Sequence, residues 1–124
     1  MSHRFARLLV LAATLAAASA ATAVTAATAE PLHVIATITA KSSRADALRT
    51  DLIKLAAAAR AEDGNLGYVL YEDRAKAGRF YTDELWRDDA ALDAHLGSPA
   101  MKAATPALSK LLAKAPVISR LRGL

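Results

Sequence analysis

The sequence predicts an α+β domain in which four strands form one sheet and two helical regions cover one of its faces. Three observations predict this class. β-branched and aromatic residues gather in four short segments bounded by turn residues. Between them, apolar residues recur at the three- and four-residue spacing of a helix. The resulting order is strand, helix, strand, strand, helix, strand, which is the split βαβ arrangement.

The first 29 residues differ in composition from the rest of the chain. They carry Arg4 and Arg7 but no acidic residue, then an apolar run from Leu8 to Ala20, and they end in Ala27-Thr28-Ala29. This is the layout of a secretory signal peptide cleaved after Ala29. The alternative is a transmembrane anchor, but the apolar run is shorter than the ~20 residues that a spanning helix needs.

The sequence therefore predicts two parts, a signal peptide at 1–29 and one domain at 30–124, with a periplasmic or secreted location for the mature protein. The leader holds 2 of the 16 basic residues and none of the 12 acidic ones, so the mature chain has a net charge of +2. The basic residues are scattered, without a stripe of interleaved aromatics, so nucleic acid is not an expected partner. Because the chain has no cysteine, the fold needs no disulfide.

The mature chain opens with a strand and a helix. Leu32 to Ala40 is rich in β-branched residues and predicts the first strand. Ser43 to Ala61 predicts a helix capped by Ser42 or Ser43, with Gly64 supplying the positive φ of the turn that follows. Alternation along the strand gives it two faces. The face turned toward the helices carries Val34, Ala36, Ile38 and Ala40. The other face, which suits a pocket or a subunit contact, carries His33, Ile35, Thr37 and Thr39.

Two strands follow, Leu66 to Asp73 and Arg79 to Arg87, joined by the short connection at 75–78. Both of their faces carry large apolar groups, yet two helical regions in so short a domain can cover only one side of a sheet. An apolar face left in water marks an interaction site, so we expect a second copy of the chain to cover it. One face combines these side chains: Tyr68, Leu70, Glu72, Phe80, Thr82, Glu84 and Trp86.

The second helical region has two parts. Asp88 is the expected N-cap of a short helix that ends at Leu96, and Ser98-Pro99 starts a longer one. Thr105-Pro106 predicts a break or kink in the longer helix, whose apolar stripe continues to Ala115. A last strand at 117–121 completes the order, which is that of a ferredoxin-like fold.

Three short segments carry a resemblance to a known family: Arg60-x-Glu62-x-Gly64-x-x-x-Tyr68, Phe80-x-x-x-Glu84-x-Trp86 and Ala91-Leu92-x-x-His95. The pattern resembles the antibiotic biosynthesis monooxygenase family, which includes small quinol monooxygenases, and it covers about Leu32 to Leu121. The resemblance implies a ferredoxin-like fold whose sheets pair as a dimeric α+β barrel, hence a homodimer. It also implies a cofactor-independent monooxygenase that oxidises quinols or related electron-rich polycyclic phenols with O₂.

His95 is the first candidate for catalysis, because imidazole exchanges protons near neutral pH. It would lie on the apolar side of its helix, and the alternative is a structural histidine bonded to a carbonyl or carboxylate. Glu84 would orient His95 or bind a substrate hydroxyl; the alternative is a buried ion pair with Arg60 or another basic group, since an inward carboxylate is costly unless paired. Tyr68 would position a substrate oxygen, or else serve as an ordinary strand aromatic.

Three further residues are expected to bind substrate. Trp86 and Phe80 would line a pocket for a flat aromatic, although both are also ordinary core residues. His33 is a weaker candidate on the mixed face of the first strand. The sequence has no cysteine nucleophile, no phosphate-binding glycine loop and no histidine spacing typical of a metal site, so no cofactor and no metal are expected.

The sequence also bears on two alternative functions. The haem-degrading branch of the same superfamily uses an Asn on the first strand and a Trp and a His on the later helices; this sequence lacks all three at the corresponding places, 32–40, 88–97 and 99–115. The second alternative is a non-catalytic dimeric α+β barrel that binds a small apolar ligand, because fold does not fix function.

Overall fold

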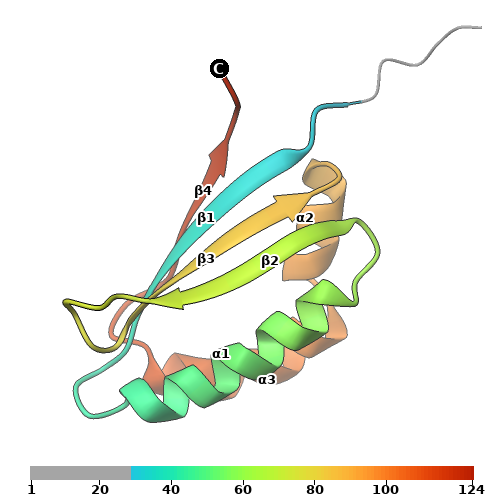
Figure 1. Cartoon of the computed structure of the whole chain (residues 1–124). Helices are drawn as coiled ribbons and strands as arrows, with labels where there is room; N and C mark the ends of the chain where they lie inside the picture. The colour runs from blue at the N-terminus through green and yellow to red at the C-terminus, as the bar shows by residue number, and fades with distance from the viewer. Residues whose placement is uncertain (1–28) are drawn as a thin grey trace, which may run out of the picture.

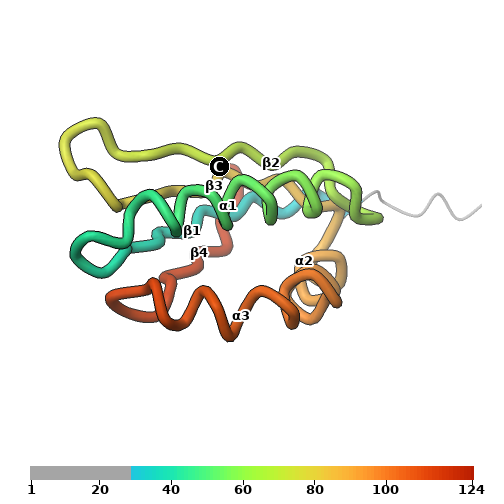
Figure 2. Tube along the Cα trace, turned by 90° about the horizontal axis from the view of Figure 1, so that it is seen from below, coloured from blue at the N-terminus to red at the C-terminus, as the bar shows by residue number. Residues whose placement is uncertain are grey.

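The computed structural model describes residues 29–124, where one antiparallel sheet carries three helices on the same face (Figure 1). Seen from below, α1, α2 and α3 all lie in front of the strands (Figure 2). The predicted signal peptide, apart from Ala29, is outside the described residues. The elements in chain order are β1 Leu32–Thr39, α1 Ala45–Arg60, β2 Asn65–Glu72, β3 Arg79–Trp86, α2 Asp89–Leu96, α3 Pro99–Leu111 and β4 Val117–Leu121.

The strand order across the sheet is β2-β3-β1-β4, with every neighbouring pair antiparallel. This order confirms the predicted ferredoxin-like fold. The register brings Val34, Glu84 and Tyr68 into one row and Ala36 and Thr82 into the next, all on the face that carries the helices. Within residues 29–124, no helix is both long enough and apolar enough to cross a membrane.

Two clusters of buried side chains form the core between the sheet and the helices. One surrounds Trp86 and the other surrounds Phe80, and both aromatic side chains are fully buried. Between the two clusters the paired residues of β1 and β3 are Ala36 and Thr82, which are small. Small side chains at this point leave space beneath the helices, and the candidate site lies there.

Two of the three predicted helix caps are confirmed. The Asp88 carboxylate accepts a hydrogen bond from the Ala91 amide at 2.8 Å, and the Ser98 hydroxyl accepts one from the Met101 amide at 3.2 Å. The predicted serine cap of α1 is wrong. Arg44 occupies the N-cap position without a side-chain bond, because Ser43 adopts a positive φ of 60° in the preceding turn.

The predicted C-terminal end of α3 is wrong, whereas its predicted start at Pro99 is confirmed. The helix runs without a break through Pro106 and ends at Leu111 rather than near Ala115. Beyond its end the chain pairs with the end of β1 instead: Leu112 forms a bridge with Ala40, and the Ala113 amide donates to the Thr39 carbonyl at 2.9 Å. These backbone bonds compete with the last turn that the apolar pattern predicted.

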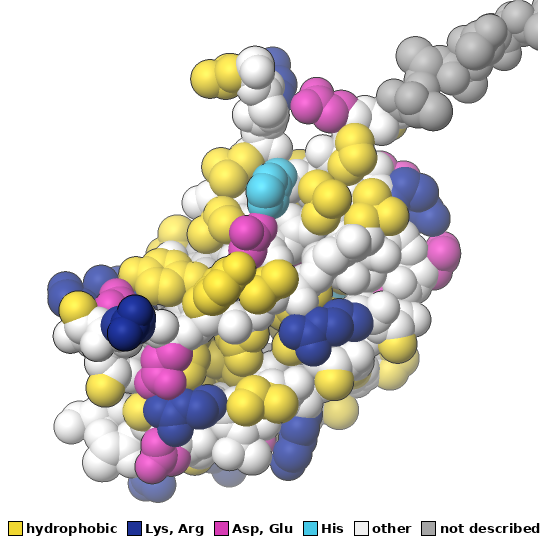
Figure 3. All heavy atoms as spheres, viewed as in Figure 1, with side chains coloured by type: hydrophobic (Ala, Val, Ile, Leu, Met, Phe, Trp, Pro, Cys, Tyr) yellow, Lys and Arg dark blue, Asp and Glu magenta, His cyan; other side chains and the backbone are white. Residues whose placement is uncertain are grey.

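The sheet face opposite the helices is apolar, as predicted. In the view of Figure 3, hydrophobic side chains gather over the strands. Val69 and Tyr71 on β2 and Val117 and Leu121 on β4 are each at least 43% exposed. We call this surface the open face. It is the kind of contiguous apolar surface that monomeric proteins rarely leave in water.

Candidate active site

A small cavity of about 90 Å³ lies between the helix-bearing face of the sheet and the helices. Apolar side chains from the sheet and from the helices form most of its wall, among them Leu52 of α1, Met101 of α3 and Ile118 of β4. Its polar wall comes from residues distant in sequence: Tyr68 on β2, Thr82 and Glu84 on β3, and His95 on α2. The three residues predicted to act in catalysis, Tyr68, Glu84 and His95, therefore meet at one cavity.

His95 is 5% exposed and is held on two sides. Its Nδ1 atom pairs with the Glu62 carboxylate, at 2.9 Å to Oε2 and 3.1 Å to Oε1. Its ring stacks on Trp86 with the centroids 4.8 Å apart, and the Tyr68 ring approaches it edge-on at 6.0 Å. Because Glu62 occupies Nδ1, the ring nitrogen left for a ligand is Nε2.

Among residues 29–124 no basic group pairs with the buried Glu84, so the alternative of an ion pair with Arg60 or another basic group is wrong. Its Oε1 accepts a hydrogen bond from the Thr82 hydroxyl at 2.6 Å, and its Oε2 accepts one from the Trp86 indole at 2.8 Å. Arg60 instead donates to the Tyr68 carbonyl at 2.8 Å. Two neutral donors on the same strand thus satisfy the carboxylate, which is how a buried charge is tolerated.

Glu84 was also expected to orient His95, and Glu62 is the residue that makes this contact. Glu62 belongs to the family pattern, but the sequence alone gives it no role at the site. It lies in the turn after α1, and nothing in the local sequence indicates that this turn packs against α2. Thr82 was missed as well, although strand alternation places it on the same face as Glu84.

The Tyr68 hydroxyl remains protonated over the working pH range of most enzymes. Burial raises the pKa of Tyr68 well above its usual value, and the negative charge of Glu84 raises it further. A tyrosine that keeps its proton is a hydrogen-bond donor and a poor base. In this cavity it can therefore donate to an oxygen on which negative charge develops.

None of the three residues predicted to bind substrate lines the cavity. Phe80 and Trp86 are fully buried in the two core clusters. Trp86 contacts two residues of the cavity from the core: its indole donates a hydrogen bond to Glu84, and its ring stacks on His95. His33 lies on the open face, where its Nε2 atom is 2.5 Å from the Asp83 carboxylate. Strand alternation fixes which face a residue occupies but not its depth, so core and cavity wall could not be told apart.

Among residues 29–124, no group of three or more His, Asp or Glu side chains is arranged to hold a metal ion. The polar groups of the cavity are instead an imidazole, a phenol, a hydroxyl and a carboxylate. These groups can take up a proton and donate a hydrogen bond to an anion, and the apolar wall around them excludes bulk water. These are the requirements of proton-transfer chemistry on a small apolar molecule.

Comparisons with known proteins agree with this fold. A Mycobacterium tuberculosis protein named "Putative monooxygenase Rv0793" is 41% identical over 69 residues, which are 56% of this chain and 67% of that one. The crystal structure of PA3566 from Pseudomonas aeruginosa superposes with a TM-score of 0.75 at 39% identity, over 80% of this chain and 99% of that one.

The crystal structure of Rv0793 superposes with a TM-score of 0.70 at 33% identity, over 77% of this chain and 96% of that one. The sequence profile of the family described as "Antibiotic biosynthesis monooxygenase" matches residues 31–107, which include Glu62, Tyr68, Glu84 and His95. This chain belongs to the antibiotic biosynthesis monooxygenase family.

Proposed function

We propose that this protein is a cofactor-independent monooxygenase that oxidises quinols or related electron-rich polycyclic phenols with O₂. One observation carries the proposal. An apolar cavity is lined by a histidine whose Nδ1 pairs with a carboxylate, which leaves Nε2 free for a substrate proton, and by a nearby tyrosine that keeps its proton. Family membership supports the oxygenase class, and the apolar wall of the cavity with its few polar groups supports an apolar substrate that carries a hydroxyl.

The reaction balances as quinol plus O₂ giving hydroxyquinone plus water. His95 takes the phenolic proton on Nε2, and the resulting anion passes one electron to O₂. The two radicals then join through a carbon–oxygen bond, and the His95 imidazolium gives its proton to the terminal oxygen of the peroxide anion, which yields a hydroperoxide and restores neutral His95. Loss of water breaks the O–O bond and removes the proton from the same carbon, which leaves one oxygen atom on the ring. The substrate supplies all four electrons.

The other groups assist at defined points of this sequence. The Glu62 carboxylate stabilises the imidazolium that forms on His95, since it already bonds to Nδ1. Tyr68 donates a hydrogen bond to the phenolate oxygen, because its hydroxyl is protonated. Trp86 and Thr82 hold Glu84 away from His95, so that Glu84 does not compete with Glu62 for the imidazole.

The test is O₂ consumption by metal-free mature protein with a naphthoquinol, alone and as His95→Ala. General base catalysis contributes about 10²- to 10⁴-fold, so the variant should lose at least 10²-fold in kcat. Added imidazole should restore part of the lost rate, because the substitution leaves a space of that shape. An unchanged rate in the variant would remove the assigned role of His95. Binding without turnover by the unmodified protein would favour the non-catalytic alternative.

We also propose that two copies of the exported protein pair through the open face. The exposed apolar side chains of β2 and β4 support this, since both strands border a face that none of the described helices covers. Val69→Lys should produce a monomer by sedimentation at micromolar concentration, since the charge would enter the interface. Ile53→Lys is the matched control, because Ile53 is also an exposed aliphatic residue, 56% against 43% for Val69, and lies on α1. Equal effects of the two changes would contradict the assigned interface.

A further inference from the structure

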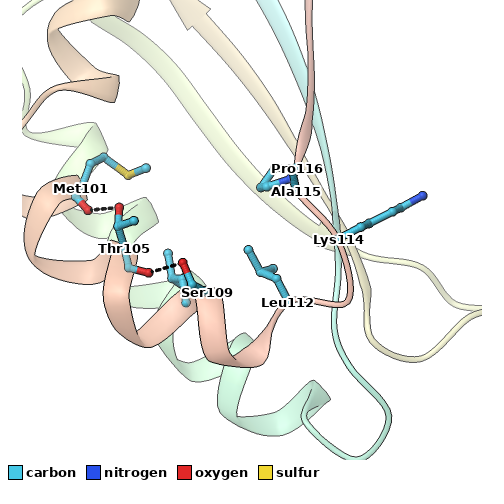
Figure 4. A pocket seen from close by; sticks show the side chains of 8 residues that line it. Met101, Thr105, Ser109, Leu112, Lys114, Ala115 and Pro116 are labelled. Carbon is cyan, nitrogen blue, oxygen red and sulfur yellow. Dashed lines mark hydrogen bonds between the residues drawn. The ribbon is translucent and has the colours of Figure 1, made fainter.

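A groove of about 510 Å³ runs along the outer side of α3, between that helix and the chain that leads into β4 (Figure 4). It extends from Met101 to Ser109, a distance of about 12 Å at the helical rise of ~1.5 Å per residue. Leu112, Ala115 and Pro116 form its other wall. The groove is more than five times as large as the cavity that holds the candidate catalytic groups.

The polar side chains of this groove are turned away from it or occupied. The Thr105 hydroxyl donates to the Met101 carbonyl at 2.7 Å, and the Ser109 hydroxyl donates to the Thr105 carbonyl at 2.8 Å. The Lys114 side chain points away from α3 toward the outside (Figure 4). What remains for a ligand is hydrocarbon, so the groove suits an apolar group rather than an anion.

The groove and the cavity adjoin each other. Four residues line both of them: Met101, Leu108, Leu112 and Pro116. The cavity alone, at about 90 Å³, is smaller than the ~150 Å³ cavity known to hold a benzene molecule. An aromatic ring can therefore place only its leading edge beside His95 and Tyr68, and the adjoining groove offers room for the rest of the molecule.

We propose that the substrate binds end-on, as a phenol or quinol that carries an apolar chain on the side opposite its reacting hydroxyl. The hydroxyl end of the substrate enters the cavity, and its apolar chain lies along α3 between Met101 and Ser109. The identity of the reacting end rests on the proposed function. The seating of the chain is a matter of binding alone, so it can be tested without turnover.

The experiment measures the dissociation constants of 4-alkylphenols, from methyl to octyl, by calorimetry on the unmodified chain. Each added methylene should tighten binding about threefold to fourfold until the chain is longer than the groove. Alkylbenzenes of the same length should bind more weakly, because they give His95 and Tyr68 no hydroxyl.

Two surface variants test where the alkyl chain of the ligand lies. Ala115→Glu places a carboxylate in the groove and should abolish the dependence on chain length. Ala113→Glu makes the same change two residues away, in the same connection but outside the groove lining, and should keep it.

Affinity that does not change with chain length, or the same loss in both variants, would overturn the proposal. Binding with the expected length dependence but without O₂ consumption by any chain-bearing quinol would leave the groove assignment intact and would defeat the monooxygenase assignment.

Discussion

Replacement of Glu62 by glutamine tests the contact that sequence reasoning missed. The carboxylate lies 2.9 Å from His95 Nδ1 and is partly buried, so the imidazolium formed during the reaction is stabilised by a charge-assisted hydrogen bond. Hydrogen bonds to charged groups contribute about 1.5–3 kcal/mol. Glu62→Gln keeps the size of the side chain but removes its charge. We expect kcat for quinol oxidation to fall about ten- to hundredfold, since ~1.4 kcal/mol corresponds to a factor of ten.

The assay is the initial rate of O₂ consumption at saturating quinol, with folding checked by circular dichroism. Asp63→Asn is the matched control, because Asp63 is the next residue and its 94% exposed carboxylate bonds to the exposed Arg87 rather than to His95. This variant should keep the rate of the unmodified protein, and Glu62→Asp should recover part of what Glu62→Gln loses. A Glu62→Gln variant as active as Asp63→Asn would refute the role given to Glu62.

Three further predictions concern single side chains. Because burial raises the pKa of Tyr68 in the folded state, the unfolded chain releases that proton first above about pH 10, so the free energy of unfolding should fall there with pH. Urea denaturation should show this fall less steeply for Tyr68→Phe, and equal slopes would contradict it. Trp86→Phe leaves the buried Glu84 without its indole donor and should lower the free energy of unfolding by about 1–3 kcal/mol in the same assay; a loss below that range would indicate that water replaces the donor. Gly64→Ala should destabilise by more than about 1 kcal/mol, because φ is +81° and a Cβ would lie 2.6 Å from the Ala91 Cβ; an unchanged melting temperature would contradict it.

The order of the elements could be predicted because hydrophobic periodicity records which side of each element is buried. The ends of helices were less predictable where distant backbone decides them. Ser43 has the composition of a helix cap, but it occupies a turn with positive φ. Leu112 continues the apolar stripe of α3, yet its backbone bridges to Ala40. Neither the turn at Ser43 nor the pairing of Leu112 with Ala40 can be recognised from the residues next to them in sequence.

Part of the site was also predictable, because the regular spacing of side chains along strands and helices fixes which face each residue occupies. Alternation along β2 and β3 placed Tyr68 and Glu84 on one face, and helical spacing placed His95 opposite them. The contact between Glu62 and His95 joins a turn to a helix 33 residues later, so no local pattern contains it. The depth of Phe80 and Trp86 depends on how closely α1 and α2 approach the sheet. The leader and the dimer stay predictions.

The most direct test of the account follows the oxygen atoms. Metal-free mature protein is given a quinol under oxygen-18 gas, and the product is analysed by mass spectrometry. The account predicts a hydroxyquinone that contains one atom of the heavy isotope, formed at a rate that depends on His95. An unlabelled quinone accompanied by hydrogen peroxide would contradict it, because the oxygen would then have served only as an electron acceptor.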